Sequence, residues 1–415
     1  MSSGQIKVIK IGGSIFRKEN VIDIAEFVVK NFEPYKTIIV VSALGRPPYP
    51  YSTDELLRLF EEFKNNNSNC TIESKLSNQL MDISKSFVVS CGENIAAGLL
   101  AFAINYVNPL YRAIPLNAFQ SGIITTSKAE DADIIDVNVT NIINLMEEKF
   151  TPVICGFQGV SKEGYITTLK RGGTDITAAF IAKIVKSQEI HIIKDVEGLK
   201  SAPPSIVPNS ITIEKCHLDE LAESSYNGNP IINPEAINII QETDTKVIIR
   251  SIFSDKYTTS SKNTTPDNLV SNLSVKENVT KFAIFLPPQM KNKTQILDTS
   301  LNKIYQNRIS LDFINLDIPN NIVSFIVDNN QEEKIRNILK DLSLDFKTIH
   351  KLSKVSVIGY NMRGKPGVMY RINKALLSEK VLIIQAQDSH ISISLLVPEK
   401  FMKTTIKSLH REFFE

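Results

Sequence analysis

Two glycine pairs, each with a basic residue beside it, are the segments best suited to chemistry. The first is KIGGS, in which Lys10 precedes Gly12 and Gly13. A strand that ends in Gly-Gly before a helix lets backbone N–H groups approach a phosphate, and the helix N-terminus adds positive potential. Lys10 adds a full positive charge, so the segment indicates a phosphate site. The structural alternative is a tight turn with a lysine in solvent.

The second pair, Gly172 and Gly173, lies between Arg171 and the dipeptide Thr174-Asp175. These glycines also precede a predicted helix, with Thr174 or Asp175 near its N-cap. Arg171 could bind a carboxylate through two parallel hydrogen bonds, and Asp175 could orient a cation or a catalytic lysine. The alternative is a helix cap with surface charges. Because a basic residue flanks each glycine pair, we expect both pairs to form one pocket.

A third candidate is Glu93 of SCGEN, which precedes the apolar run IAAGLLAFAI. We expect it at the start of a helix, where the helix dipole alone would favour a carboxylate. The functional interpretation is an ion pair with the ammonium group of a substrate.

The elements that must position these residues alternate between strand and helix. Residues 37–43 form a largely apolar run, typical of a strand buried on both faces of a parallel sheet. Similar runs predict strands at 6–11, 87–90, 151–156, 189–194 and 246–250, and helical spacing appears at 20–30 and 174–185. Such alternation predicts an open α/β sandwich.

The C-terminal part has a different organisation. Residues 254–272 are almost free of apolar side chains and are predicted to be a linker. Beyond them, the order strand–helix–strand–strand–helix (βαββα) is predicted twice, in 273–346 and 347–415, which indicates a duplicated module. Two unrelated α+β segments are the alternative.

Composition excludes several classes of function. Lys and Arg total 47 and Asp and Glu 45, and Trp is absent, so neither nucleic-acid binding nor a polybasic membrane role is supported. The longest apolar stretch, 95–107, is shorter than the roughly 20 residues of a membrane span. Four scattered cysteines and five scattered histidines match no metal-site spacing. With a short polar start that is no signal peptide, the chain is predicted to be cytoplasmic.

Taken together, the motifs resemble those of a known enzyme family. KIGGS, VVSALG, YSTDELL, SCGEN, GFQG, RGGTDITAA, DVEG and NGxxxxNPEA occur in the order and spacing of an aspartokinase. GYNMRGKPGVMYRI and QAQDSHISISLLV resemble the second of two C-terminal ACT modules. The resemblance covers residue 7 to the C-terminus. It implies an amino-acid-kinase α/β/α sandwich with a mostly parallel sheet over 1–253, followed by two βαββα ACT-like modules.

The reaction implied is transfer of the γ-phosphoryl group of ATP to the side-chain carboxylate of L-aspartate, giving 4-phospho-L-aspartate. This is the first step of lysine-, threonine- and methionine-type biosynthesis. Mg²⁺ would bridge the phosphates. Phosphoryl transfer depends on positioning and charge stabilisation more than on covalent chemistry. A carboxylate is already nucleophilic, so no general base is required.

The resemblance also implies roles for individual residues. Lys10 would neutralise the transferring group with Asp175 orienting it, while Gly12 and Gly13 would offer N–H groups to the phosphates. Glu93 would hold the substrate ammonium group and Arg171 its α-carboxylate. The remaining residues of the aspartate site would be Ser42, Thr53, Gly172, Gly173 and Thr174.

The nucleotide side departs from the family pattern. In residues 194–205, Asp195 and Gly198 are retained, but the family's nucleotide-binding Arg and Asp are replaced by Ser205 and Pro203. A second phosphate-binding lysine of the family is replaced by Pro230. Each charge-assisted contact contributes about 1.5–3 kcal/mol. Two lysines not found in the family pattern, Lys194 and Lys200, could compensate, which is a hypothesis.

Three interpretations follow: an active aspartokinase, one with altered substrate or nucleotide, or a non-catalytic amino-acid-binding regulatory subunit. We favour activity because Lys10, Arg171 and Asp175 are all present. In the family, ACT modules dimerise and bind an amino-acid effector, so a homodimer or higher homo-oligomer is expected. The first module lacks the usual Pro-Gly turn at 287–292, whereas the second keeps Gly364, Pro366 and Gly367.

Overall fold

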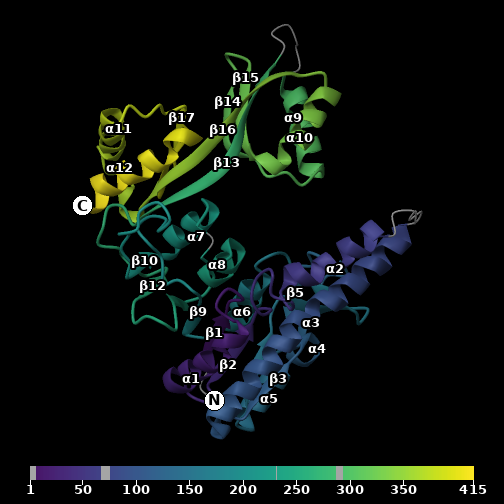
Figure 1. The fold of residues 1–415 in the computed structure, drawn as a ribbon. Coiled ribbons are helices and arrows are strands. Elements are labelled where there is room, and N and C mark those ends of the chain that lie inside the picture. The colour runs from purple at the N-terminus through teal and green to yellow at the C-terminus, as the bar shows by residue number, and fades with distance from the viewer. Residues whose placement is uncertain (1–5, 67–74, 230, 287–292) are drawn as a thin grey trace. The chain divides into compact units, whose positions relative to one another are not determined.

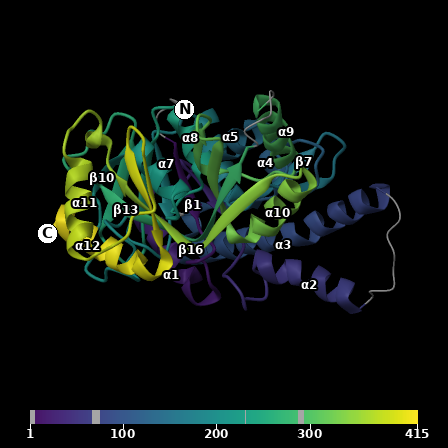
Figure 2. The same cartoon turned by 90° about the horizontal axis from the view of Figure 1, so that it is seen from above.

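The computed structural model describes residues 6–66, 75–229, 231–286 and 293–415. The chain divides into two units (Figures 1 and 2). The first comprises residues 1–199, 212–225 and 230–266, and the second 200–211, 226–229 and 267–415.

An eight-stranded sheet forms the centre of the first unit. Its order is β10 (Lys215–His217), β12 (Tyr257–Ser261), β11 (Lys246–Arg250), β9 (Glu189–Ile193), β1 (Lys7–Ile11), β2 (Thr37–Val41), β6 (Thr151–Cys155) and β3 (Ala113–Leu116). All neighbours are parallel except β11 and β12. All five residues of β2 are buried, because helices cover both faces of a parallel sheet.

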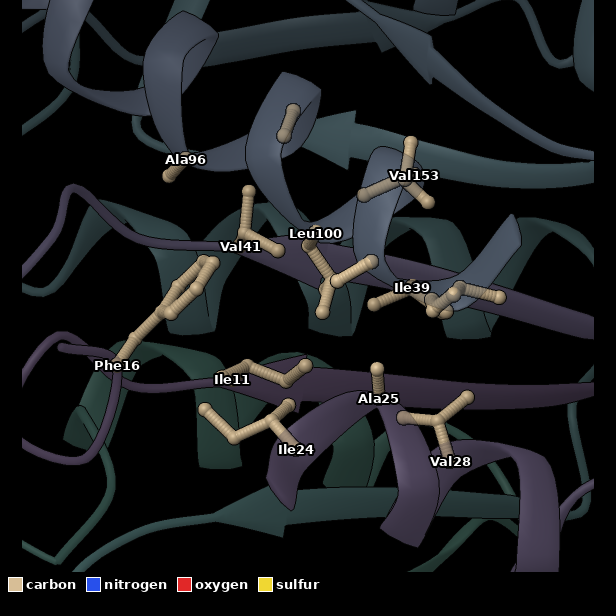
Figure 3. Close-up of a cluster of buried hydrophobic side chains, with 14 of the residues drawn as sticks. Ile11, Phe16, Ile24, Ala25, Val28, Ile39, Val41, Ala96, Leu100 and Val153 are labelled. Atoms are coloured by element: carbon tan, nitrogen blue, oxygen red, sulfur yellow. The ribbon is translucent and has the colours of Figure 1, made fainter. Parts of the chain in front are cut away.

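Successive side chains of a strand point to opposite faces of the sheet, so those of β1 pack into two different layers. Ile9 and Ile11 face a hydrophobic cluster shared with α1 (Val21–Asn31) and α3 (Lys75–Val107). Figure 3 shows side chains of this cluster, among them Ile11, Val41 and Leu100. Lys10 faces the other way, toward α6 (Gly173–Ile184), which packs with α8 (Pro234–Gln241). The three-layer α/β/α sandwich predicted for this part is confirmed.

A smaller four-stranded sheet completes the first unit, with the order β5 (Ile134–Val137), β4 (Ile123–Thr125), β7 (Gln158–Ser161) and β8 (Ile166–Thr168). Helix α2 (Thr53–Asn66) lies beside α3, as Figures 1 and 2 both show. The remaining helices are α4 (Ala118–Ser121), α5 (Thr140–Glu147) and α7 (Leu218–Tyr226).

Two predictions for this part are wrong. Residues 87–90, predicted as a strand, lie within α3, whose 33 residues continue unbroken from Lys75. Residues 257–261, placed in a linker, form β12 and pair with both β10 and β11. The strand forms because Thr258 and Ser260 are buried in it, and Thr258 Oγ1 donates to Ile213 O and accepts from Leu199 N.

Helix α3 is long and apolar enough to cross a membrane by length and composition. Over residues 78–107, however, 56% of the most apolar window is buried inside the protein. Such burial is typical of a core helix.

The second unit contains one antiparallel six-stranded sheet. Its order is β14 (Asp312–Asp317), β15 (Ile322–Asp328), β13 (Asn272–Phe285), β16 (Asp345–Ile358), β18 (Ser392–Pro398) and β17 (Gln385–Asp388). With α9 (Lys293–Gln306), α10 (Glu332–Asp341), α11 (Val368–Ser378) and α12 (Met402–Phe414), the order βαββα occurs twice, as predicted. The 14-residue strand β13 begins the first repeat and the 14-residue strand β16 begins the second. The two strands pair along most of their length, which joins both repeats in one sheet. Strand β16 crosses the predicted 346/347 division. Residues 287–292 lie outside the described residues.

Candidate active site

The site begins at the carboxyl ends of three neighbouring strands. Gly12 follows β1, Ser42 follows β2 and Lys194 follows β9, and these strands are adjacent in the order β9-β1-β2. Parallel strands end at the same edge of a sheet, where loops gather to form ligand sites. Loops that are far apart in the sequence are thereby brought together, and Ser14 Oγ donates to Asp195 Oδ1 at 2.8 Å across 181 positions of the chain.

A buried ion pair lies at the centre of this edge. Lys10 Nζ is 2.8 Å from Asp175 Oδ1, and each side chain is only 7% exposed. The backbone N–H of Asn233 donates to the other Asp175 oxygen at 2.9 Å. Burial raises the pKa of Asp175, but the charges of Lys10 and Lys194 together with these hydrogen bonds leave it below its usual value. The structural alternative, in which Lys10 faces solvent, is therefore wrong.

The first glycine pair leads into a turn rather than a helix, because α1 begins only at Val21. The N–H of Gly12 donates to Ile193 O at 3.0 Å. Contrary to our expectation, this N–H is therefore not available to a phosphate. A Cβ atom at Gly12 would lie 3.4 Å from Lys10 Nζ, and one at Gly13 only 2.6 Å from Ala43 O. These glycines therefore provide space beside the lysine and between loops.

The second glycine pair does open a helix, as predicted. Gly172 has φ +85°, and α6 begins at Gly173. A Cβ atom at Gly172 would lie 2.5 Å from Asn233 Nδ2, which donates to Arg171 O at 3.1 Å. Asn233 thus connects Arg171 with Asp175. The Arg171 side chain is 91% exposed and lies 4.0 Å from Asp54 Oδ2 at the start of α2.

Glu93 lies in the middle of α3, not at a helix start, so the helix dipole does not explain it. One carboxylate oxygen accepts from the N–H of Ala43 at 3.0 Å. The other, Oε2, is buried and has no hydrogen-bond partner among the described residues. Burial raises the pKa of Glu93 to about 8. A buried carboxyl group with one unpaired oxygen suits a cationic ligand group, whose positive charge would favour the ionised form of Glu93.

The structure also places the other predicted substrate residues around this edge. The N–H of Ser42 donates to Ile11 O at 3.1 Å, and Thr53 is the first residue of α2. That helix start is near Glu93, because a Cβ atom at Gly92 would lie 2.9 Å from Tyr51 O. Thr174 packs against Gly156, where a Cβ atom would be 2.5 Å from Thr174 Cγ2.

On the nucleotide side, Lys194 is close enough to interact electrostatically with Lys10, Asp175 and Asp195. Burial lowers the pKa of Lys194 to about 8, although Asp175 partly offsets that effect. Gly198, at φ +147°, packs on Thr258.

Three other residues of the predicted nucleotide side, Lys200, Pro203 and Ser205, belong to the second unit. Pro230 lies outside the described residues.

Sequence reasoning missed three residues of the site. Asn233 makes two of its central hydrogen bonds, Asp54 is the nearest acid to Arg171, and Arg46 is close enough to lower the pKa of Lys194. Asn233 had a signal, since it begins the NPEA motif. Asp54 also had one, since it belongs to the YSTDELL motif, whereas Arg46 is a single charge directly after VVSALG and had none.

Glu93→Gln is expected to remove a pH dependence of stability. Because the pKa of Glu93 is raised, the folded chain binds a proton at this carboxyl group more tightly than the unfolded chain does. Protonation of Glu93 therefore stabilises the fold fully below pH 4.5, and this stabilisation is lost as pH rises through about 8. The variant should show a flatter melting-temperature profile between pH 5 and 8 than the parent. If the melting temperatures of variant and parent change with pH in parallel, the raised pKa of Glu93 is contradicted.

Comparison with known proteins agrees with this geometry. The amino acid kinase family model matches residues 5–251 and an ACT domain model matches residues 355–413. Aspartokinase 1 of Bacillus subtilis is 30% identical over 389 residues, which are 92% of this chain and 91% of that protein.

Two solved structures share the fold. The structure of E. coli aspartokinase III in complex with aspartate and ADP (R-state) covers 99% of this chain and is itself covered completely, with a TM-score of 0.79 at 20% identity. The structure of the same enzyme in complex with lysine and aspartate (T-state) has the same coverage, with a TM-score of 0.72 at 19% identity. The sequence matches and the shared fold together show that this chain belongs to the aspartokinases, the aspartate kinases of the amino acid kinase family.

Proposed function

We propose that the aspartate kinase reaction of this family is carried out here by the residues around the Lys10–Asp175 pair. The γ-phosphoryl group of ATP would pass to the side-chain carboxylate of L-aspartate, giving 4-phospho-L-aspartate. The observation that carries the proposal is the buried ion pair at 2.8 Å, at the strand edge where the loops meet. A fixed ammonium group in a partly dehydrated site stabilises developing phosphoryl charge far better than one in water.

Asp175 acts on Lys10 rather than on the substrate. Its two oxygens are used by the Lys10 ammonium and the Asn233 N–H, so it holds the lysine in one direction. The lysine then meets the phosphate without reorganisation, which is the requirement for positional catalysis. The aspartate substrate supplies its own nucleophilic carboxylate.

Glu93 and Arg171 would hold the two ends of the amino-acid backbone. Glu93 offers a buried, unpaired oxygen to the ammonium group, while the exposed guanidinium of Arg171 can form two hydrogen bonds to the α-carboxylate. Ser42, Thr53 and the Gly172–Thr174 helix start would line the space between them.

Arg171→Ala is expected to raise KM for aspartate by about 10- to 100-fold, since a charge-assisted bidentate contact contributes about 1.5–3 kcal/mol. Its melting temperature should not change, because the side chain is 91% exposed. Steady-state kinetics with each substrate varied will check this. A rise confined to the nucleotide KM would mean that the two sides of the site are reversed.

Magnesium would be held by the nucleotide phosphates together with Asp195. Asp195 is exposed beside the Gly12–Gly13 loop, and one carboxylate with phosphate oxygens and waters is a usual Mg²⁺ environment. Within the described residues there is no group of three or more His, Cys, Asp or Glu that could hold a metal alone. The ion would add charge neutralisation on the phosphates. Gly198 and Lys200 remain proposed nucleotide residues.

A hydroxamate assay with ATP, Mg²⁺ and L-aspartate tests the reaction directly. We expect aspartyl hydroxamate to accumulate in proportion to enzyme. If none forms with any nucleoside triphosphate, the chain is instead an amino-acid-binding regulatory homologue.

We also propose an amino-acid effector site on the C-terminal repeats, association of those repeats into at least a dimer, and a cytoplasmic location. Supporting an effector loop, Gly364 and Gly367 have φ values of +68° and +95°, and a Cβ atom at either would meet nothing within 4 Å. Supporting a reducing compartment, Cys91, Cys155 and Cys216 are free.

A further inference from the structure

Asn233 lies between the residues proposed for the amino acid and those proposed for the phosphoryl group. It directly precedes α8, and its backbone N–H donates to Asp175 Oδ2 at 2.9 Å. Its side-chain amide donates from Nδ2 to Arg171 O at 3.1 Å. The first contact holds the carboxylate that orients Lys10, and the second holds the turn that carries Arg171. One residue therefore connects the positions of the two cations.

The side-chain hydrogen bonds of Asn233 require an amide at this position. Oδ1 accepts from the N–H of Glu235 at 2.8 Å, which caps α8, while Nδ2 donates to Arg171 O. Exchanging the two amide atoms would set a donor against the Glu235 N–H and an acceptor against the Arg171 carbonyl, so the partners determine the orientation. Asn, Asp and Ser cap helices about equally well. Of the three, only asparagine has one atom for the cap and a separate donor for Arg171.

The turn that accepts this hydrogen bond leaves room for the amide. Gly172 has φ +85°, and a Cβ atom on it would lie 2.5 Å from Asn233 Nδ2. The amide therefore lies directly against the glycine backbone. The side chain of Arg171, by contrast, is 91% exposed, and its ion pair with Asp54 spans 4.0 Å. The direction in which the guanidinium leaves the turn thus depends on how the Arg171 backbone is held.

We infer that Asn233 is a positioning residue for the amino-acid substrate, which acts through the backbone of Arg171. This role rests on the proposed function, in which Arg171 binds the α-carboxylate and Lys10 stabilises the transferring phosphoryl group. A fixed number of bonds joins the α-carboxylate of aspartate to its reacting carboxylate, so the arginine must lie at a matching distance from the lysine. A misplacement of about 1 Å can cost on the order of 100-fold in rate. Asn233 maintains this distance because it holds both sides.

Asn233→Ser separates the helix cap from the bond to Arg171. A serine hydroxyl can still accept from the Glu235 N–H, and the backbone N–H still reaches Asp175, but the donor to Arg171 O is removed. We expect KM for L-aspartate to rise about 3- to 10-fold, the usual effect of one neutral hydrogen bond. The nucleotide KM and the melting temperature should stay at the parent values. Steady-state kinetics with each substrate varied and thermal unfolding will measure these quantities.

Asn117→Ser is the control, because Asn117 caps α4 in the same way and has no role in the proposed site. It should leave both KM values at the parent level. Asn233→Asp, which keeps a cap but also lacks the donor, should raise KM for aspartate at least as much as Asn233→Ser, and it replaces the serine variant if that fails to fold. An unchanged KM for aspartate, or an equal rise in both KM values, would overturn the inference.

A double variant tests whether Asn233 acts through Arg171. Once the side chain of Arg171 is removed, a shift of its backbone changes nothing at the α-carboxylate. Asn233→Ser combined with Arg171→Ala should therefore have the same KM for aspartate as Arg171→Ala alone. If the two effects multiply instead, the inference is wrong and the proposed function still stands. If Arg171→Ala alone leaves this KM unchanged, both the inference and the proposed role of Arg171 fail.

Discussion

Lys10→Met is expected to lower kcat by at least about 100- to 1,000-fold, the usual loss when one fixed donor to a developing charge is removed. It is also expected to destabilise the fold by about 3–5 kcal/mol, because Asp175 would be left as a buried charge without its closest partner. Turnover by the hydroxamate assay and unfolding by denaturant will measure the two effects. Retention of kcat would contradict the role given to Lys10.

A double variant separates catalysis from folding. Lys10→Met with Asp175→Asn removes both charges of the pair, and the asparagine can still accept the Asn233 N–H through its carbonyl oxygen. We expect most of the lost stability to return while kcat stays at the level of the single variant. A double variant that recovers activity along with stability would show that Lys10 is structural only.

The central sheet could be predicted from the sequence because its strands are buried on both faces. The short, uninterrupted apolar run that forms β2 is typical of a strand in the middle of a parallel sheet. The start of α6 was equally accessible, since only glycine readily adopts the φ of +85° found at Gly172. These positions are determined by local chemistry, so a single sequence reveals them.

Helix α3 shows why other elements were not predictable. Its buried face includes the polar or small residues Ser86, Ser90, Gly92 and Glu93. Polar residues there hide the helical repeat, and the apolar run at 87–90 then resembles a strand. Strand β12 is hidden for a related reason: its buried positions are Thr258 and Ser260.

Most residues of the candidate site could be predicted from the sequence, but the contacts between them could not. Lys10 and Asp175 could be paired only through the resemblance, since 165 residues separate them in the sequence. The engagement of the Gly12 N–H by Ile193 and the two bonds of Asn233 depend on how loops from different strands meet. No pattern within one segment records such contacts.

Lys194→Thr and Lys194→Met are expected to lower kcat/KM for the nucleotide by about 10- to 100-fold, the effect of losing one charge-assisted contact of about 1.5–3 kcal/mol. Lys194 follows β9 beside Lys10 and Asp175, where it could replace the phosphate-binding lysine that the family has at the position of Pro230. Unlike Lys10→Met, Lys194→Met should keep or raise the melting temperature, because burial disfavours the charged lysine.

The pH profile identifies this lysine independently of affinity. Burial lowers the pKa of Lys194 to about 8, so its charge is present below that pH and lost above it. The value of kcat/KM reports the ionisation of the free enzyme. In the parent, kcat/KM for the nucleotide should therefore fall as pH rises through 8, and this alkaline limb of the profile should be absent from the Lys194 variants. Lys200→Ala serves as the comparison. If it abolishes the limb while Lys194→Met retains it, Lys200 supplies the compensating charge instead.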